Sequence, residues 1–251
     1  MSSYSLEHKR VLLTRSEQHL SPLATAVSAR GAVPIAFPCL QVEVLAAAIG
    51  QATGTYSDVV FSSSNGVHAV ASQVDLAALC RDKRVAAVGK KTAATLQAYG
   101  MDVDIVPDIA SQDGLIAAYA QHGLPQSLLF FRAEQGRDRL VKALQSQAVQ
   151  VRLVLAYRTV CPSVGATDVI NSLRHDDIDA VLLGSAKTAR FYIQRIGSIR
   201  LADRPVLVVI SEALGEAVRE MGLSVQVVAK QASFEAMLDA LAEYFDSSRS
   251  C

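Results

Sequence analysis

The feature that most constrains the fold of this 251-residue chain is an internal repeat. Segment 58–71, DVVFSSSNGVHAVA, is similar to segment 179–193, DAVLLGSAKTARFYI. Further along, and in the same order, segment 85–100, VAAVGKKTAATLQAYG, is similar to segment 206–222, VLVVISEALGEAVREMG. Self-similarity over segments this long is typical of one structural unit that is encoded twice. We therefore expect two related units rather than one large domain.

A third pair of segments predicts how the two units are ordered along the chain. LLTRSEQHLSPLATAVSARGA, which starts at Leu12, is similar to FFRAEQGRDRLVKALQSQA, so that Arg15 and Arg132 are equivalent. The arginine-bearing strand of the first unit thus lies near the N-terminus, whereas the other strands of that unit come late in the chain. One unit is therefore expected to be inserted in the other. The predicted domains are 1–36 with 162–251 for the discontinuous domain one and 37–161 for the inserted domain two.

Short aliphatic runs alternate with helical patterns and predict an α/β fold. Examples are DVVFS at 58–62, SLLFF at 127–131 and VLVVI at 206–210. Runs that are apolar on both faces are typical of parallel strands covered by helices on each side, so each sheet should be doubly wound. The chain is expected to cross between the domains in extended segments at about 37–43 and 155–162, because nearby prolines disfavour helix at the preceding residue.

The composition excludes several classes of protein. With 24 Lys+Arg against 24 Asp+Glu, the chain has no overall field that would attract nucleic acid or an anionic membrane. No apolar run approaches the roughly 18 residues of a membrane span, and the start MSSYSLEHKR is polar, so we expect a cytoplasmic protein. The cysteines, at 39, 80, 161 and 251, stand too far apart for a zinc or redox motif, and the histidines show no ligand spacing. Nucleotide fingerprints such as GxGxxG are missing, so we expect no metal and no cofactor.

The order of motifs along the chain resembles the uroporphyrinogen-III synthase family from end to end. The motifs are VLLTR, a proline-bearing crossover, DVVFSSSNGV, VAAVGKKTA, SQDGL, FFRAEQGRDRL, LAYRTV, DAVLLGSAKT and VVISEALGEAVREMG. The chain departs from the family pattern at Ser16, where proline is common, and at Gly184, where threonine is common before serine. A further departure is the Ser211-Glu212-Ala213-Leu214 loop, which stands in place of Gly-x-x-Thr.

The resemblance implies two flavodoxin-like lobes joined by a two-strand linker, and an enzyme that needs no cofactor. Its reaction is the dehydrating cyclisation of hydroxymethylbilane to uroporphyrinogen III, with inversion of ring D, in the cleft between the lobes. In the mechanism proposed for the family, loss of the hydroxyl leaves an azafulvene cation, and attack at the substituted end of ring D gives a spiro intermediate that fragments and recloses. We expect a monomer that binds this small-molecule substrate and contacts the preceding enzyme of the pathway transiently.

The predicted substrate carries acetate and propionate groups on four pyrroles, so its site must bind many carboxylates. Residues 37–161 hold 11 Lys+Arg against 10 Asp+Glu and cannot act as a simple charge trap. The SSSNG, VGKKT and FRAEQG segments each follow a predicted strand and should open a helix, whose free N–H groups favour anions. Ser, Thr and Asn are also ordinary helix N-caps, and capping alone is the alternative at each position. The predicted substrate-binding residues are Arg15, Ser62, Ser63, Asn65, Gly89, Lys90, Lys91, Thr92, Ser111, Arg132, Gly136, Arg137, Ser185, Lys187 and Ser211.

Tyr157 is the predicted catalytic residue. The resemblance places it at the family's tyrosine in the second crossover, where that residue faces the cleft and takes part in removing the terminal hydroxyl of the substrate. A phenol can donate a proton or a hydrogen bond to a leaving hydroxyl while the electron-rich pyrrole expels it. The alternative is an aromatic residue at the end of a strand, with its ring packed and its hydroxyl in water.

The residues alone leave two other functions open. A two-lobed small-ligand-binding module, built like the periplasmic binding proteins, would hold a ligand without turning it over. A flavodoxin-like mononucleotide binder is the second alternative, because a doubly wound sheet binds ligands at the carboxyl ends of its strands whatever the chemistry.

Overall fold

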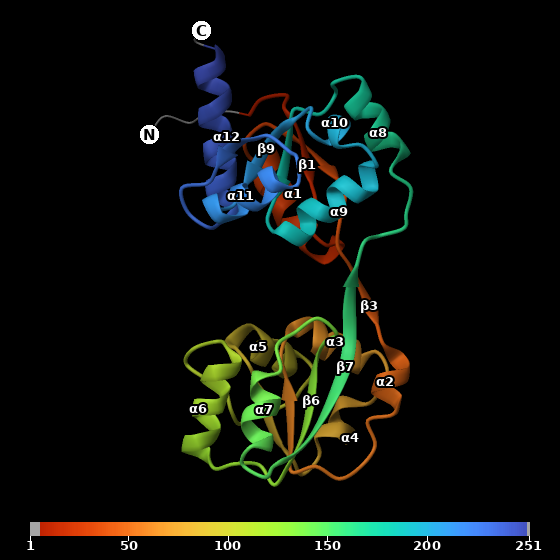
Figure 1. Cartoon of the computed structure of the whole chain (residues 1–251), viewed down its shortest axis with the longest axis vertical. Coiled ribbons are helices and arrows are strands. Elements are labelled where there is room, and N and C mark those ends of the chain that lie inside the picture. Colours follow the sequence, from red (N-terminus) through yellow and green to blue (C-terminus); the bar gives the residue numbers. More distant parts are fainter. Residues whose placement is uncertain (1–5, 250–251) are drawn as a thin grey trace. The chain divides into compact units, whose positions relative to one another are not determined.

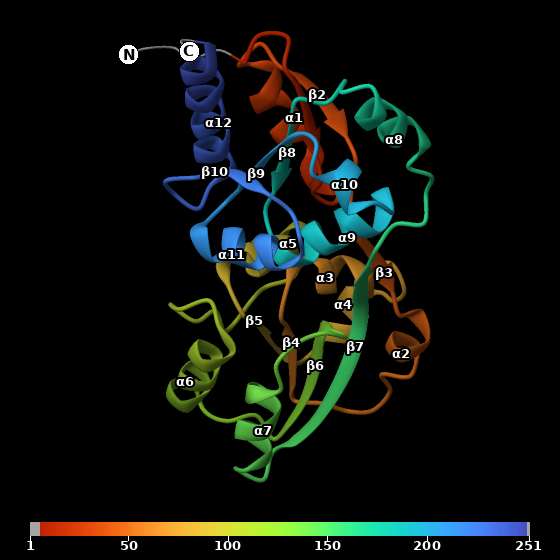
Figure 2. The ribbon, with the colours of Figure 1, turned by 45° about the horizontal axis from the view of Figure 1, so that its top comes forward.

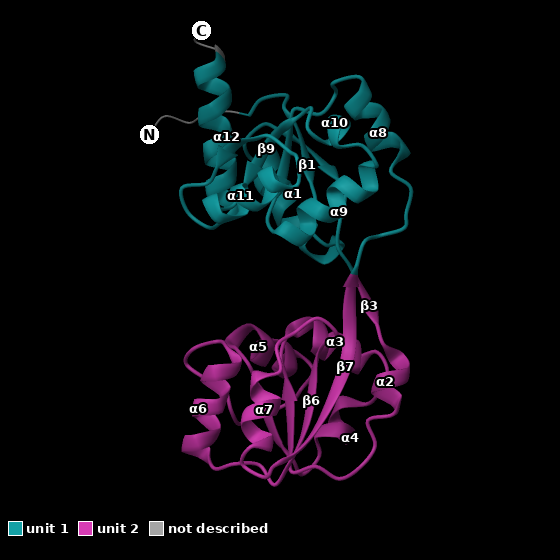
Figure 3. Cartoon of the chain, viewed as in Figure 1, with its two compact units in different colours: residues 1–41, 160–251 teal, residues 42–159 magenta. Residues whose placement is uncertain are grey.

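Two α/β units, each with its own hydrophobic cores, make up the chain in the computed structural model, which describes residues 6–249 (Figure 3). Unit 1 contains the residues up to Gln41 and from Val160 onward, and unit 2 contains Val42–Thr159. Both borders of unit 2 thus lie a few residues inside the range 37–161 that the sequence predicts for the inserted domain. Phe37 and Cys39 account for the difference at the first border, because both side chains are buried in a core of unit 1.

The sheet of unit 1 has five parallel strands in the order β10-β9-β8-β1-β2. Numbered by their place along the unit, the strands read 5-4-3-1-2, which is the flavodoxin-like order 2-1-3-4-5 seen from the other edge. The prediction of a flavodoxin-like, doubly wound lobe is confirmed. The strands are β1 (Arg10–Leu13), β2 (Val33–Ala36), β8 (Ala180–Leu183), β9 (Val206–Val209) and β10 (Val225–Val228).

Helices cover both faces of this sheet (Figure 1). Val11 and Leu13 pack against helices α1 and α12, whereas Leu12 between them points to the opposite core, which contains residues of α8, α9, α10 and α11. The two-residue period of a strand therefore explains why the run is apolar throughout. The helices are η1 (Glu17–His19), α1 (Leu20–Ser28), α8 (Thr167–Arg174), α9 (Ala186–Ile196), α10 (Ile199–Ala202), α11 (Glu212–Glu220) and α12 (Phe234–Arg249).

Unit 2 contains a second five-stranded sheet, in the order β3-β7-β6-β4-β5, and Ile105 extends its edge through a parallel bridge to Ala86. β6 and β7 lie side by side in both ribbon views (Figures 1 and 2). Helices α3 and α5 contribute to the core on one face, and α6 and α7 contribute to the core on the other. The elements are β3 (Gln41–Val44), α2 (Ala46–Gly50), β4 (Asp58–Phe61), α3 (Ser64–Ala71), α4 (Leu76–Cys80), β5 (Arg84–Ala87), α5 (Lys90–Ala98), α6 (Gln112–His122), β6 (Ser127–Ala133), α7 (Arg139–Gln145) and β7 (Gln150–Val160).

The two sheets share one topology with different starting points along the chain. β6 and β7 of unit 2 correspond to β1 and β2 of unit 1, and β4, β5 and Ile105 correspond to β8, β9 and β10. In unit 1 the chain leaves after its second strand and returns for the other three. In unit 2 the counterparts of these three strands precede β6 and β7, and the edge strand β3, which comes before them, has no counterpart in unit 1. This circular permutation is the arrangement that the order of the sequence repeats implies. None of the helices that the structure describes is long and apolar enough to cross a membrane.

Arg195 of α9 anchors both crossing segments to unit 1. Its guanidinium donates hydrogen bonds to the carbonyl of Pro38 on the first crossing and, at 2.9 Å, to the carbonyl of Val164, two residues after the second. The same guanidinium lies over the ring of Phe37, 3.9 Å from its centroid. Both crossings are extended on the side of unit 2, where they form β3 and β7.

A close backbone approach fixes the start of α6 and generates a testable expectation. A Cβ atom on Gly114 would lie 2.1 Å from the carbonyl oxygen of Ile109, whereas one on Gly50 would meet no heavy atom within 4 Å. We expect Gly114→Ala to lower the free energy of unfolding of unit 2 by about 1–3 kcal/mol, because backbone must move to admit the methyl group. Gly50→Ala, the matched control in the same unit, should be neutral or stabilising by up to about 1 kcal/mol. Urea unfolding of both full-length variants tests this, and equal midpoints would contradict it.

Candidate active site

The carboxyl edge of the unit 2 sheet has the topology of a ligand site. β6 lies between β7 and β4, and the helices that follow β6 and β4 pack on opposite faces of the sheet. In doubly wound sheets, ligands bind in the crevice that such a switch point leaves outside the strand ends. The loops that border this point carry Ser62 and Ser63 after β4, and Gln135 and Gly136 after β6. Several of the predicted site residues are therefore placed where a ligand is expected.

Ser63 connects the N-terminus of α3 to Tyr157. Its backbone is extended, and its Oγ accepts a hydrogen bond from the N–H of Gly66 at 3.1 Å, which makes it the N-cap of the helix. The same Oγ lies 2.8 Å from the hydroxyl oxygen of Tyr157, and either group can be the donor. The tyrosine is only 7% exposed, so its hydroxyl is fixed by a protein partner rather than by bulk water.

A bulge in β7 aims Tyr157 at Ser63. Along β6 and β7, Arg132 pairs with Leu155 and the next residue, Ala133, pairs with Tyr157, so that Ala156 is the extra residue. Side chains alternate across a regular strand, and an extra residue shifts that alternation. Ala156 and Tyr157 consequently both pack in the core on the α3 face. Without the bulge, the phenol would point to the other face of the sheet.

The N-terminus of α5 is tied to that of α3. Thr95 Oγ1 of α5 donates to Ser64 Oγ at 2.8 Å, and Ser64 Oγ donates to the carbonyl of Lys91 at 3.3 Å. The N-cap of α5 is Gly89, where a Cβ atom would approach the Cβ of Ala110 to 2.9 Å. The two helices therefore present their free N–H groups next to each other, which suits a ligand with several carboxylates.

The other predicted residues of α5 and α6 differ in exposure. Lys90 and Lys91 are exposed, whereas Thr92 is buried in the first turn of α5. Ser111 caps α6 by accepting a hydrogen bond from the N–H of Gly114 at 2.9 Å. Gln112 then joins α6 to α7, because it donates to the carbonyl of Arg137 and accepts from the N–H of Leu140.

The segment after β6 differs from the expectation. FRAEQG was expected to open a helix, but β6 extends to Ala133 and α7 begins only at Arg139. Arg132 explains the loop between them, because its buried guanidinium donates to the carbonyls of Ala133 and Glu134 and pairs with Asp138 at 2.6 Å. The Arg132 charge thus stabilises its own loop. Gly136 packs against the same guanidinium, and Arg137 is exposed.

Unit 1 repeats the capping pattern at its own strand ends. Ser185 caps α9 by accepting from the N–H of Thr188 at 3.1 Å, and Ser211 caps α11 by accepting from the N–H of Leu214 at 3.4 Å. Lys187 lies 5.7 Å from the centroid of the Phe191 ring. Capping, the alternative that the sequence left open, is thus observed at Ser63, Ser111, Ser185 and Ser211, and it leaves the other N–H groups of each first turn available.

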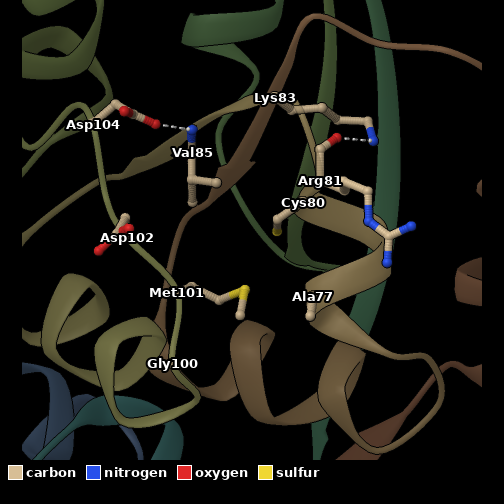
Figure 4. Close-up of a pocket in the computed structure, with 9 residues that line it drawn as sticks. All are labelled: Ala77, Cys80, Arg81, Lys83, Val85, Gly100, Met101, Asp102 and Asp104. Carbon is tan, nitrogen blue, oxygen red and sulfur yellow. Dashed lines mark hydrogen bonds between the residues drawn. The ribbon is translucent and has the colours of Figure 1, made fainter.

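A pocket of about 280 Å³ in unit 2 lies away from these strand ends, beside the start of β5 (Figure 4). Its lining includes Cys80, Met101 and Asp104. Asp104 accepts a hydrogen bond from the N–H of Val85 at 2.7 Å, and Lys83 donates to the carbonyl of Leu79 at 2.7 Å. Burial raises the pKa of the Cys80 thiol to about 11, which keeps it protonated and unreactive near neutral pH. This pocket is not part of the candidate site.

Comparison with known proteins identifies the family. The family described as uroporphyrinogen-III synthase HemD matches residues 21–239. The chain belongs to the uroporphyrinogen-III synthase family. A relative named uroporphyrinogen-III synthase from Synechococcus elongatus is 32% identical over 209 residues, which is 79% of this chain and 78% of the relative. A protein of the same name from Chlorobaculum parvum is 24% identical over 242 residues, which is 94% and 98% of the two chains.

Solved structures show that the fold is shared with other uroporphyrinogen III synthases. A mutant of the enzyme from Thermus thermophilus has a TM-score of 0.57 at 17% identity, over 95% of this chain and 99% of that chain. The protein from Helicobacter pylori has a TM-score of 0.58 at 13% identity, over 94% and 99%. The family and the enzyme class that the sequence predicts are confirmed, and neither the ligand-binding module nor the mononucleotide binder is favoured. The expected cleft between the lobes stays a prediction.

The hydrogen bond between Ser63 and Tyr157 can be measured by a double-mutant cycle. Ser63→Ala should destabilise unit 2 by about 1–2 kcal/mol through loss of the cap, and its effect should not add to that of Tyr157→Phe. We expect a coupling of about 0.5–1.5 kcal/mol in urea unfolding, because each substitution removes the same hydrogen bond. Ser111→Ala is the matched control: it removes a cap on the other face of the sheet and should be additive with Tyr157→Phe. Additive effects for both pairs would rule out the bond in solution.

Proposed function

We propose that this chain converts hydroxymethylbilane to uroporphyrinogen III and water, with inversion of ring D and without a cofactor. The observation that carries the proposal is the partly buried hydrogen bond between Ser63 and Tyr157 at the start of α3. It joins a phenol, which can protonate a leaving hydroxyl, to a helix N-terminus, which can stabilise the negative charge that the phenol then acquires.

The proposed proton transfer, from Tyr157 to the substrate, is supported by a series of hydrogen bonds that begins at the N-terminus of α3. The N–H of Gly66 donates to Ser63 Oγ. Of the two possible directions of the Ser63–Tyr157 bond, we assign the one in which the Ser63 hydroxyl donates to the phenol oxygen, so that Tyr157 donates its own proton to the terminal hydroxyl of the bilane. The C–O bond breaks as water leaves, and the pyrrole nitrogen lone pair stabilises the azafulvene cation. Hydrogen bonds arranged in series polarise one another, so the chain favours proton release from the phenol.

The remaining steps of the cyclisation need no added reagent. The substituted carbon of ring D attacks the azafulvene carbon to give the spiro intermediate, which fragments and recloses with ring D inverted. A proton then leaves the newly closed macrocycle and restores the phenol of Tyr157. Ring closure without inversion needs no such control, so the main task of the protein is to hold the flexible substrate in one conformation.

Backbone groups are the proposed carboxylate ligands in unit 2. The first turns of α3 and α5 lie next to each other, and Ser62, Asn65 and Thr92 add short polar side chains there. Lys90 and Lys91 are exposed, so each adds only a screened charge, worth about 1 kcal/mol or less. We also propose a monomer that acts in the cytoplasm and receives its substrate during transient contact with the preceding enzyme of the pathway.

A direct assay tests the proposed activity. We expect the purified chain, treated with chelator and given fresh hydroxymethylbilane, to yield the type III isomer, whereas buffer alone yields type I by uninverted closure. The two isomers are separated after oxidation to the porphyrins. Formation of type I alone would refute the synthase proposal, and activity that returned only with added metal would refute its cofactor-free form.

Tyr157→Phe tests the role of the phenol. We expect turnover to fall about 10- to 1000-fold, because one proton donor to the leaving hydroxyl is lost while the ring remains packed. Tyr99→Phe is the matched control, since it removes the phenolic hydroxyl of an exposed residue in unit 2 that bonds the ring of His68. Tyr99 caps the C-terminus of α5 through its backbone N–H, which the substitution leaves in place. If the folded Tyr157→Phe variant kept its turnover, the catalytic role of Tyr157 would be contradicted and the residue would have only a packing role.

A further inference from the structure

Arg15 of unit 1 differs from its repeat equivalent in unit 2. Arg132 pairs with Asp138, whereas none of the ion pairs found among residues 6–249 includes Arg15. Arg15 is nevertheless partly buried, and this burial lowers the pKa of its guanidinium. A partly desolvated cation with no ion-pair partner among the described residues is a ready partner for an external anion.

Phe234 holds this guanidinium in place. The Arg15 guanidinium carbon lies 4.5 Å from the centroid of the Phe234 ring. Phe234 is the first residue of α12, whose start is fixed by Ser233 Oγ accepting the N–H of Ala236 at 3.1 Å. An arginine stacked on a ring keeps its N–H donors at the edge of the guanidinium plane, where they can bind a carboxylate with two parallel hydrogen bonds.

Gly184 provides the space for the ring. A Cβ atom on Gly184 would lie 2.8 Å from Cζ of Phe234, so any larger residue there would displace the ring. Gly184, which stands where threonine is common in the family, thus leaves the room that the Phe234 ring occupies. Gly184 and Arg15 therefore both contact the Phe234 ring.

These residues lie at the topological switch point of the unit 1 sheet. β1 lies between β2 and β8, and Arg15 and Gly184 follow the ends of β1 and β8. Thr14 Oγ1 donates to the carbonyl of Leu182 at 2.6 Å and joins the two strand ends. Ser185 follows Gly184 as the cap of the eleven-residue helix α9, whose first N–H groups also favour an anion.

We propose that Arg15 binds one carboxylate of the tetrapyrrole and that Phe234, seated on Gly184, is the positioning residue that orients Arg15 for this contact. The inference rests on the proposed function and names a binding contact in unit 1. In this proposal Phe234 acts on the substrate only by orienting Arg15. Loss of the Phe234 ring should therefore weaken binding and leave the chemical step unchanged.

Product binding and turnover of full-length variants test the inference. We expect Phe234→Leu to raise the KM for hydroxymethylbilane and the Kd for uroporphyrin III about 3- to 10-fold, with kcat changed less than about 2-fold, because the stacked guanidinium loses its support. Phe245→Leu is the matched control. It removes another aromatic ring of α12, whose centroid lies 4.4 Å from Lys9 Nζ, and it should change neither the KM nor the Kd. Arg15→Gln should raise the Kd about 10-fold, and Phe234→Leu should then add nothing further.

Two further measurements separate the possible failures. Gly184→Ala keeps the ring but displaces it, and should raise the Kd in the same direction as Phe234→Leu. The inference would be overturned if Phe234→Leu and Phe245→Leu had equal effects, or if Arg15→Gln left the Kd unchanged. It would also be overturned if the losses of Arg15→Gln and Phe234→Leu added up in the double variant. Fluorescence titration with uroporphyrin III reports on binding even if the wild-type chain forms only the type I isomer, a result that would refute the proposed function instead.

Discussion

The hydrogen bond between Ser63 and Tyr157 is the interaction on which the proposed chemistry depends. It joins the end of a strand to the start of a helix, and each partner is held by a separate feature of unit 2. Ser63 is fixed because it caps α3, and Tyr157 is fixed because a bulge at Ala156 turns it to the α3 face. The phenol is thus oriented before the substrate arrives, which spares the reaction the cost of ordering it.

The permuted repeat gives the two units equivalent strand ends with different side chains. In unit 2 the shared topology supports the phenol of Tyr157, and Arg132, near the end of β6, binds groups of the loop that follows it. In unit 1 the equivalent Arg15 stacks on Phe234, and we propose that it binds a ligand carboxylate. In this proposal one fold supplies an acid in one unit and an anion site in the other, because the local contacts of the two equivalent arginines differ.

The fold and the helix caps could be predicted from sequence because their signals are local or repeated. Strand runs apolar on both faces indicate covered parallel sheets, and a serine at the start of a helical pattern indicates an N-cap, as Ser185 shows. The bulge at Ala156 could not be predicted, since register depends on the partner strand. The helix expected at FRAEQG failed for a similar reason, because Arg132 binds the carbonyls of that loop. Gly184 gave a signal through its departure from the family pattern, but only the structure places Phe234 against it.

The proposed chemistry requires that a preformed pair of hydroxyls at the start of α3 meets the reacting end of the tetrapyrrole. A crystal structure of the chain with bound uroporphyrinogen III or a stable bilane analogue would show whether it does. We predict ligand carboxylates on the N–H groups of the first turns of α3 and α5, with the Tyr157 hydroxyl in contact with both Ser63 and the ligand. A ligand bound elsewhere, with the Tyr157 hydroxyl still enclosed by protein and out of its reach, would contradict this mechanism.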